Sequence, residues 1–229
     1  MKRAILGFCI TAPLVVCMLS GEASKARCEN RSAGLAAANI FAGVDPRTEL
    51  VTALRKLKSA YPYRQTVTTT STENDQVASS ETSVTEFASA SRIRVKSTGQ
   101  DGKRSEMIII GNFSYLFFEG KWIKQEQSAD EKAMMEGAQD KFIASMSDVK
   151  FAGLETVNGR KCRAYTYRWG LGDISVSGKF PEGIGKAWIG VADGLPYQMD
   201  QDLGINGHRT KYHTVYEHRA RISIAMPRT

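Results

Sequence analysis

The sequence predicts an α+β protein that is mainly β, a single domain of about ten antiparallel strands with two helices. Runs rich in Val, Thr, Tyr and Ile are separated by tight-turn pairs such as Asn158-Gly159 and Asp193-Gly194. Such pairs favour β-hairpins because Asn and Gly tolerate the positive φ of the turn. Apolar residues recur at helical spacing in two segments, residues 45–61 and 128–146. No Gly/Ser linker, low-complexity run or internal repeat divides the chain.

The first 26 residues have the form of an export signal. Two basic residues precede an uncharged apolar run over residues 4–19, and small residues follow it. The run is near the short end for a bilayer span, so cleavage is favoured over a membrane anchor. Acylation of Cys17 stays open as a less favoured alternative, because Val16 is large for the residue before an acylated cysteine. We therefore expect residues 1–26 to be a signal peptide and the protein to reach the periplasm.

The mature chain is expected to form one domain over residues 27–229, with residues 27–44 loosely ordered. It keeps the cysteines Cys28 and Cys162. In an oxidising compartment two remaining cysteines often form a disulfide. The alternative is an unpaired Cys28 near the new N-terminus and a buried, inert Cys162, and the sequence leaves both open.

Two segments predict helices. Asp45-Pro46 predicts a helix start, since Asp caps free amide groups and Pro in the first turn has no N–H to lose. Tyr61-Pro62 predicts its end. Ser128-Ala129-Asp130-Glu131 predicts a capping box at the start of the second helix. Apolar residues then recur every four positions, at Met134, Ala138, Phe142 and Met146.

The other segments predict strands, because they are rich in β-branched and aromatic residues and are bounded by turn residues. Two strands flank the Asp193-Gly194 turn, and Pro196, which has no N–H, is expected at a sheet edge or at the first residue of the second of them. Alternation puts Tyr165, Tyr167 and Trp169 on one face of their strand. The remaining strands are expected over residues 63–70, 77–87, 92–95, 106–111, 113–118, 121–123, 149–157, 160–169, 208–217 and 219–226.

Several short motifs follow one another between residues 45 and 226. They are Leu54-Arg55-Lys56-Leu57, Tyr63-Arg64-Gln65-Thr66, Phe113-Ser114-Tyr115 ahead of Gly120-Lys121-Trp122, the run Gly159 to Tyr165, and Trp188-Ile189 with Asp193-Gly194-Leu195-Pro196. In this order they resemble the lipoprotein-carrier (LolA/LolB-like) superfamily. One departure is Ser89-Ala90-Ser91, where the carriers have a basic residue followed by Pro. The resemblance therefore implies lipid binding more strongly than lipoprotein shuttling.

The resemblance implies an open, strongly curved half-barrel with a helical lid over a hydrophobic cavity that binds acyl chains. Flexible methionine side chains suit a site for variable chains, and each buried methylene contributes about 0.8 kcal/mol. The alternative for any one of these residues is ordinary core packing. The predicted cavity residues are Leu54, Leu57, Tyr115, Phe117, Trp122, Met134, Met135, Ala138, Phe142, Met146, Tyr165 and Tyr167.

No enzyme motif supports catalysis. The chain has neither a Gly-x-Ser-x-Gly elbow nor a P-loop, and the spacing of five between His208, His213 and His218 puts neighbours on opposite faces of a strand. The net charge of +7 comes from scattered basic residues that form no block, so nucleic acid is not predicted as a partner. The sequence predicts neither a cofactor nor a metal. We expect a non-catalytic periplasmic carrier or chaperone that binds acyl chains and touches membrane surfaces transiently. The alternative is an envelope-stress sensor or adaptor of the same fold that contacts a protein partner.

Overall fold

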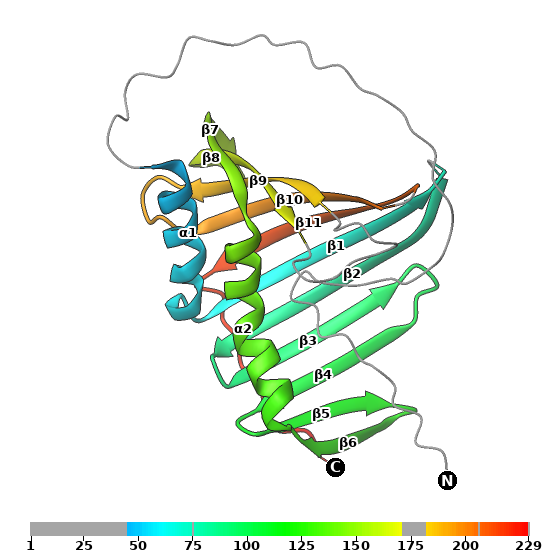
Figure 1. Cartoon of the computed structure of the whole chain (residues 1–229). Helices are drawn as coiled ribbons and strands as arrows, with labels where there is room; N and C mark the ends of the chain where they lie inside the picture. The colour runs from blue at the N-terminus through cyan, green and yellow to red at the C-terminus, as the bar shows by residue number, and fades with distance from the viewer. Residues whose placement is uncertain (1–44, 75, 171–181, 206, 229) are drawn as a thin grey trace.

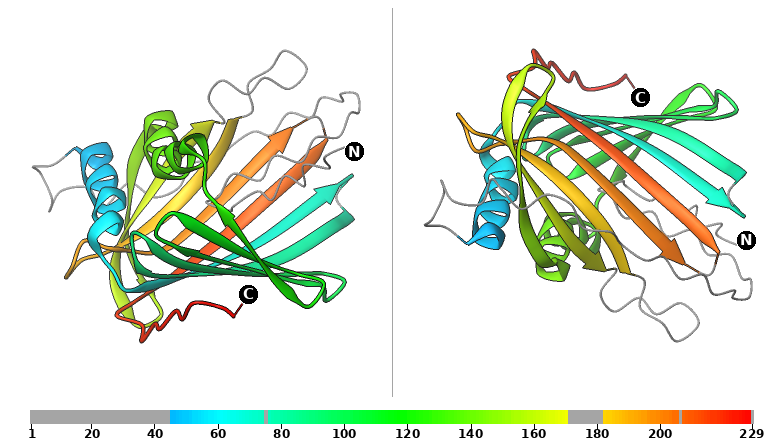
Figure 2. Two further views of the ribbon diagram at one scale, coloured as in Figure 1. Left: turned by 90° about the horizontal axis from the view of Figure 1, so that it is seen from below. Right: turned by 90° about the horizontal axis from the view of Figure 1, so that it is seen from above.

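The structure, a computed structural model, describes residues 45–74, 76–170, 182–205 and 207–228. Eleven strands form one antiparallel sheet in the order β6-β5-β4-β3-β2-β1-β11-β10-β9-β8-β7. The sheet is curved, and in the described part no ladder joins its edge strands β6 and β7 (Figures 1 and 2). The predicted open, mainly β architecture is confirmed. The signal peptide, residues 27–44 and Cys28 lie outside the described residues.

The strands match the predicted segments with extensions of a few residues at their ends. Their bounds are β1 (Tyr63–Glu73), β2 (Gln76–Ser89), β3 (Arg92–Gly99), β4 (Arg104–Ile110), β5 (Phe113–Phe118), β6 (Lys121–Glu126), β7 (Ser147–Val157), β8 (Arg160–Gly170), β9 (Glu182–Gly190), β10 (Pro196–Ile205) and β11 (His208–His218). Pro196 is the first residue of its strand, where its missing N–H removes no ladder bond.

Both predicted helices form with the predicted caps. Helix α1 (Pro46–Lys56) begins after Asp45, whose carboxylate accepts a hydrogen bond from the Thr48 amide at 2.9 Å, and a short 3-10 helix η1 (Leu57–Ser59) follows it. Helix α2 (Ala129–Ser145) has a complete capping box between Ser128 and Glu131. These local hydrogen bonds satisfy amide groups that the first helical turn leaves without partners.

The two predicted hairpin turns also form. Asn158 and Gly159 both adopt positive φ, 49° and 76°, in the turn between β7 and β8. Gly194 has a φ of 65° in the turn between β9 and β10. A positive φ at these places is the reason for the Asn-Gly and Asp-Gly pairs in the sequence.

The order of the strands requires α2 to cross the sheet. Strands β6 and β7 are consecutive in the chain apart from α2, yet they form opposite edges. Helix α2 therefore spans one face of the sheet, and α1 lies beside it (Figure 1). We call the face that both helices cover the inner face, and the opposite one the outer face. The largest buried cluster joins α1 and the end of α2 to strands β1 and β8–β11 on the inner face.

The predicted last strand, residues 219–226, does not form. This segment carries no ladder and instead runs over the outer face, where Ile224 is buried against Ile108 and Tyr115. Arg92 donates a hydrogen bond from Nη1 to the carbonyl oxygen of Ile224 at 3.1 Å. The apolar and polar residues of this segment do alternate. The alternation arises because an extended peptide packs one side on the outer face of the sheet, without joining the sheet as a strand.

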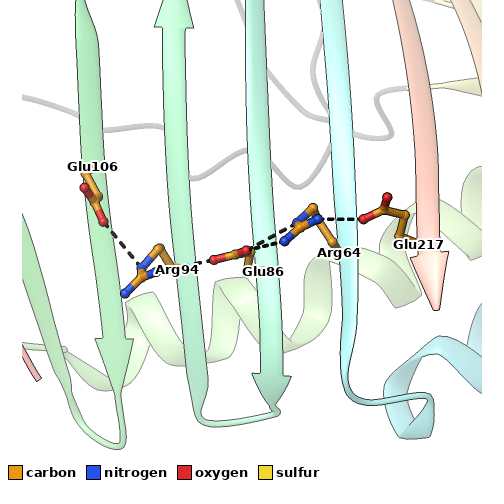
Figure 3. Close-up of polar contacts among 5 residues, drawn as sticks. All are labelled: Arg64, Glu86, Arg94, Glu106 and Glu217. Atoms are coloured by element: carbon orange, nitrogen blue, oxygen red, sulfur yellow. Dashed lines mark hydrogen bonds and ion pairs between the residues drawn. The ribbon is translucent and has the colours of Figure 1, made fainter. Parts of the chain in front are cut away.

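The outer face also carries a ladder of ion pairs across five strands (Figure 3). Glu86 lies at its centre and accepts hydrogen bonds from Arg64 at 2.9 and 3.2 Å, while Arg94 pairs with Glu86 at 3.5 Å. Glu217 and Glu106 form the two ends, at 2.7 Å from Arg64 and 3.4 Å from Arg94. Charges of alternating sign on neighbouring strands stabilise the register of the sheet.

Candidate functional site

The inner face is dominated by aromatic side chains from β8. Tyr165, Tyr167 and Trp169 alternate along this strand, share the inner face as predicted, and are at most 2% exposed. Leu203 and Tyr212, from β10 and β11, extend the same cluster. Large aromatic rings on consecutive inward positions give this part of the sheet a continuous apolar wall.

Two glycines of β9 let the aromatic rings lie close to the sheet. Gly185 pairs with Tyr167 and Gly183 pairs with Trp169. A Cβ atom at Gly185 would lie 2.3 Å from a ring carbon of Tyr167, and one at Gly183 would lie 2.5 Å from Nε1 of Trp169. The rings therefore occupy the space that side chains of β9 would otherwise fill, so the glycines are required for the wall.

Helix α1 closes one end of the wall. Leu54 and Leu57, both predicted for the site, are buried in the inner cluster. Glu49 accepts a hydrogen bond from the hydroxyl of Tyr165 and pairs with Arg163 at 3.0 Å. Burial, and then the hydrogen bond to Glu49, raise the pKa of Tyr165, so its hydroxyl stays protonated. This contact fixes α1 against β8.

Helix α2 has its buried side chains in its C-terminal half. Phe142 and Ile143 are its buried residues, and the Phe142 ring lies edge-on to the rings of Tyr167 and Trp169, at centroid distances of 6.2 and 6.0 Å. Met146 is buried in the same cluster but caps the helix end in an extended conformation. The structure thus brings the predicted residues of β8, α1 and the end of α2 together.

The N-terminal half of α2 is less buried than predicted. Met135 and Ala138 are half-buried, whereas Met134 is 59% exposed. A spacing of four drifts around a helix with 3.6 residues per turn, so Met134 and Phe142 point in different directions. Met134 does not belong to the inner cluster.

Three residues predicted for the cavity, Tyr115, Phe117 and Trp122, lie on the outer face. Tyr115 packs against Ile108 and Ile224 on the outer face, and Trp122 joins that cluster. Phe117, paired with Trp122, is on the same side and is 41% exposed. Paired residues of a ladder share a face, and the ladders connect Tyr63 through Phe87, Ile93 and Ile109 to Ser114, which puts Tyr115 opposite. The structure therefore does not bring Tyr115, Phe117 and Trp122 to one cavity with Tyr165, as was predicted.

Other inner-face residues were not predicted. On β4 and β5 this face carries Met107, Ile109 and Leu116, and Met107 and Ile109 are buried. From β10 and β11 it carries Met199, Leu203, Tyr212 and Tyr216. The alternation of each strand contains this information, but only the register between strands decides which alternate set faces the helices.

A pocket of about 310 Å³ lies between the two helices. Its lining residues are Arg47, Thr48, Val51, Thr52, Arg55, Asp140, Ile143 and Ala144. Asp140 pairs with Lys58 at 2.8 Å, which ties α2 to η1 just after α1. The pocket has a polar rim over apolar residues of the inner cluster.

The predicted disulfide stays a prediction, because Cys28 lies outside the described residues. Cys162 is fully buried on the outer face with Ala164, Trp188 and Tyr197, and burial raises the pKa of its thiol. His213 contacts Asp200 at 2.6 Å, while His218 contacts the carbonyl oxygen of Pro196 at 2.7 Å. Within the part of the chain that the structure describes, no cluster of three His, Cys, Asp or Glu has the arrangement of a metal site.

An open antiparallel half-barrel with two helices on an apolar inner face defines the fold class. No protein-family model and no curated protein matches the chain. Among solved structures, the lipoprotein LppX of Mycobacterium tuberculosis is similar, with a TM-score of 0.51 and 12% identity over 78% of this chain and 99% of that one. This likeness is one of fold, and it agrees with the open half-barrel that the LolA/LolB-like resemblance implies.

Two further solved structures are similar at lower scores. LprF of Mycobacterium bovis has a TM-score of 0.48 and 11% identity, covering 80% of this chain and 96% of that one. A LolA superfamily protein of Nitrosomonas europaea has a TM-score of 0.38 and 9% identity, covering 78% and 95%. Among the described residues, neither helix is long and apolar enough to cross a bilayer.

Proposed function

We propose that this protein is a non-catalytic carrier that binds acyl chains of lipids or lipoproteins on the inner face of its sheet, beneath α2. The observation that carries the proposal is the aromatic wall of β8 under a helix that is anchored at one end. The surface of this wall is apolar, and an acyl chain gains about 0.8 kcal/mol for each methylene that leaves water. The shared fold with LppX, itself described as a lipoprotein, is consistent with this class of function.

Movement of α2 is the step that would admit a chain. The helix buries Phe142 and Ile143 near its C-terminus, whereas its N-terminal half has its own capping box and a hydrogen bond from Gln127 to the sulfur of Met135. Met135 and Ala138, which precede Phe142 along the helix, are half-buried. An outward rotation of the N-terminal half would therefore expose inner-face residues at a low cost in broken contacts.

The exported mature chain would meet membranes in the periplasm. The full sequence has a net charge of +7, and removal of residues 1–26 (Lys2, Arg3, Lys25 and Glu22) leaves the mature chain basic, which favours anionic lipid surfaces. At the tip of the β5–β6 hairpin, Phe117 and Phe118 are 41% and 48% exposed beside Lys121. Aromatic and lysine side chains together suit the interface between lipid headgroups and acyl chains. We propose this tip as the place of transient membrane contact.

Lipid content tests the carrier function directly. The mature protein is purified without detergent, and native mass spectrometry with lipid extraction identifies what it carries. We expect an acylated lipid with the wild type and with Ala133→Trp, whose site on α2 is exposed. Ala138→Trp, on the half-buried side of the same helix, should reduce the lipid content while thermal unfolding stays cooperative. A lipid-free wild type that takes up no envelope lipid would contradict the carrier function.

The alternative is a sensor or adaptor that contacts a protein partner. In the described part, β6 is an edge strand of the sheet, and its Ile123 is 49% exposed. An edge strand with exposed apolar side chains suits the addition of a strand from another chain. A lipid-free protein that binds a periplasmic partner, and that loses this binding with Ile123→Pro, would favour the adaptor over the carrier.

A further inference from the structure

Within the part of the chain that the structure describes, several buried polar atoms on the aromatic wall have no hydrogen-bond partner. They are the hydroxyl of Tyr167, Nε1 of Trp169, and both side-chain polar atoms of Gln201. The three residues are 2%, 2% and 3% exposed, so bulk solvent does not reach these atoms. Buried polar groups are almost always hydrogen-bonded, and each unsatisfied one costs free energy. Several on one wall indicate a missing partner.

The backbone brings these atoms together across three strands. Gly185 pairs with Tyr167 on one side and with Gln201 on the other. Because Gly185 has no side chain, the Tyr167 ring extends over β9 and its hydroxyl faces the Gln201 side chain. No hydrogen bond of normal geometry joins the two. Trp169 extends over Gly183 in the same way, one inward position further along β8.

Three of these four polar atoms can donate a hydrogen bond, and only Oε1 of Gln201 cannot, so the set favours a ligand with a hydrogen-bond acceptor. Burial raises the pKa of Tyr167 well above its ordinary value, so its hydroxyl keeps its proton and can donate. The indole N–H of Trp169 donates only, and the amide of Gln201 adds further donors. The surrounding side chains include Phe142, Met199 and Leu203. In such apolar surroundings an uncharged acceptor costs less to bury than an anion.

We propose that Tyr167, Trp169 and Gln201 form a polar subsite for the ester carbonyl of a bound acyl lipid. This inference rests on the proposed carrier function and adds the chemical group that the wall recognises. The Phe142 ring covers Tyr167 and Trp169 in the unloaded protein, at centroid distances of 6.2 and 6.0 Å. The Phe142 side chain therefore turns away from the two rings when the ester binds, while Ile143 keeps the end of α2 in place, and hydrocarbon on either side of the ester lies against the apolar wall.

Two lipids that differ only at the ester test this subsite. One is 1-palmitoyl-lysophosphatidylcholine, and the other is its 1-O-hexadecyl ether analogue, which has the same headgroup and chain length but no carbonyl. Isothermal titration of the mature protein gives the ratio of their affinities. We expect the wild type to bind the ester roughly fivefold to tenfold more tightly, the value of one or two net hydrogen bonds.

Variants then locate the preference. Tyr167→Phe and Gln201→Leu should each bring the affinity ratio of ester to ether close to one while leaving ether binding unchanged. Tyr216→Phe is the matched control, because its hydroxyl is also buried on the inner face but already donates to the sulfur of Met199 at 3.5 Å. This variant should keep the wild-type ratio. In the lipid-free state, Tyr167→Phe should keep or raise the Tm, since it removes a hydroxyl without a partner.

Each other outcome has a definite meaning. Equal affinity of the wild type for the two lipids overturns the ester subsite while leaving the carrier function in place. A ratio that Tyr167→Phe leaves unchanged, together with a lower Tm, shows that the hydroxyl serves a buried water and also overturns it. A wild type that binds neither lipid contradicts the carrier function and the subsite together.

Discussion

Trp188 on β9 donates its indole N–H to the carboxylate of Glu155 on β7 over 2.7 Å, across the intervening strand β8. The contact is open because the β8 residues at this point, Cys162 and Ala164, are small and fully buried. Lys186 adds a second donor, with Nζ at 2.7 and 3.0 Å from the two carboxylate oxygens of Glu155. This contact joins three strands at the β7 edge of the sheet.

Loss of the Glu155 carboxylate should make the free energy of unfolding less dependent on pH in the acidic range. The hydrogen bond from Lys186, followed by that from Trp188, lowers the pKa of Glu155 below its ordinary value of 4.5. A carboxyl whose pKa falls on folding stabilises the protein fully above its unfolded pKa, and this contribution is lost as the pH falls through the folded pKa. Glu155→Gln should cost about 1–2 kcal/mol at neutral pH, because Trp188 loses a charged acceptor.

Urea unfolding of the wild type and Glu155→Gln at pH 7 and at pH 3 measures this contribution. The difference in unfolding free energy should shrink at the lower pH, where both proteins lack the charge. Glu182→Gln is the control, since its partner Arg168 is 50% exposed and such surface pairs contribute little. An equal difference at the two pH values would argue against an ionic role for Glu155.

The centre of the outer-face ladder should matter more than its end. Glu86, with a side chain 17% exposed, contacts two arginines, whereas Glu217 is 59% exposed and contacts Arg64 alone. Glu86→Gln should destabilise the protein by about 1–2 kcal/mol, and Glu217→Gln by less than about 0.5 kcal/mol. Chemical denaturation at low and at high salt measures the two losses of stability. High salt should reduce the difference between them, because it screens the charges. Equal losses for the two variants would contradict a ladder centred on Glu86.

Gly185, which lies under the Tyr167 ring, should not tolerate even a methyl group. In Gly185→Ala the new Cβ would lie 2.3 Å from the Tyr167 ring, so the ring must move, at a cost of about 2–3 kcal/mol. Gly204→Ala on β10 is the control, because a Cβ there would have no atom of a non-neighbouring residue within 4 Å, and it should be neutral or slightly stabilising. Thermal unfolding distinguishes them. Adding Tyr167→Ala to Gly185→Ala should then cost less than the sum of the two single changes.

The C-terminal segment should stabilise the outer face through one side chain. Ile224 is 2% exposed against Ile108 and Tyr115, whereas Met226, two residues later, is 63% exposed. Ile224→Ala should cost about 2–4 kcal/mol because it leaves a cavity in a buried cluster, and Met226→Ala should be close to neutral. Equilibrium denaturation gives both values. A loss below about 0.5 kcal/mol for Ile224→Ala would show that the segment is not held on the sheet.

Local structure was predictable because its causes are local. Asp45 caps α1 through the amide three residues later, Ser128 and Glu131 form their capping box, and Asn158 and Gly194 adopt the positive φ of their turns. Each of these depends on a few neighbouring residues. The shared inner face of Tyr165, Tyr167 and Trp169 was also predictable, since alternation along a strand needs no information from elsewhere.

The site could be predicted only where the two faces of a strand carry different kinds of side chain. On β8 the aromatic set and the small set differ, so the pattern distinguishes the faces. On β4 both faces are buried: Met107 and Ile109 point inward, while Ile108 lies under Ile224. A run of four apolar residues has no period that marks the helix-covered side. Tyr115, Phe117 and Trp122 were therefore assigned to the wrong face.

The sequence by itself determined the strands, the helices, their caps and the turns, because these arise from hydrogen bonds and φ preferences within a few residues. Tertiary structure alone decided which alternate set of β4–β6 faces the helices, that residues 219–226 cover a face and join no ladder, and that Tyr167 meets Gln201 across Gly185. These features depend on register between strands and on which distant segment covers each face. Such contacts are chosen by the burial of apolar surface over the whole sheet, which no single segment encodes.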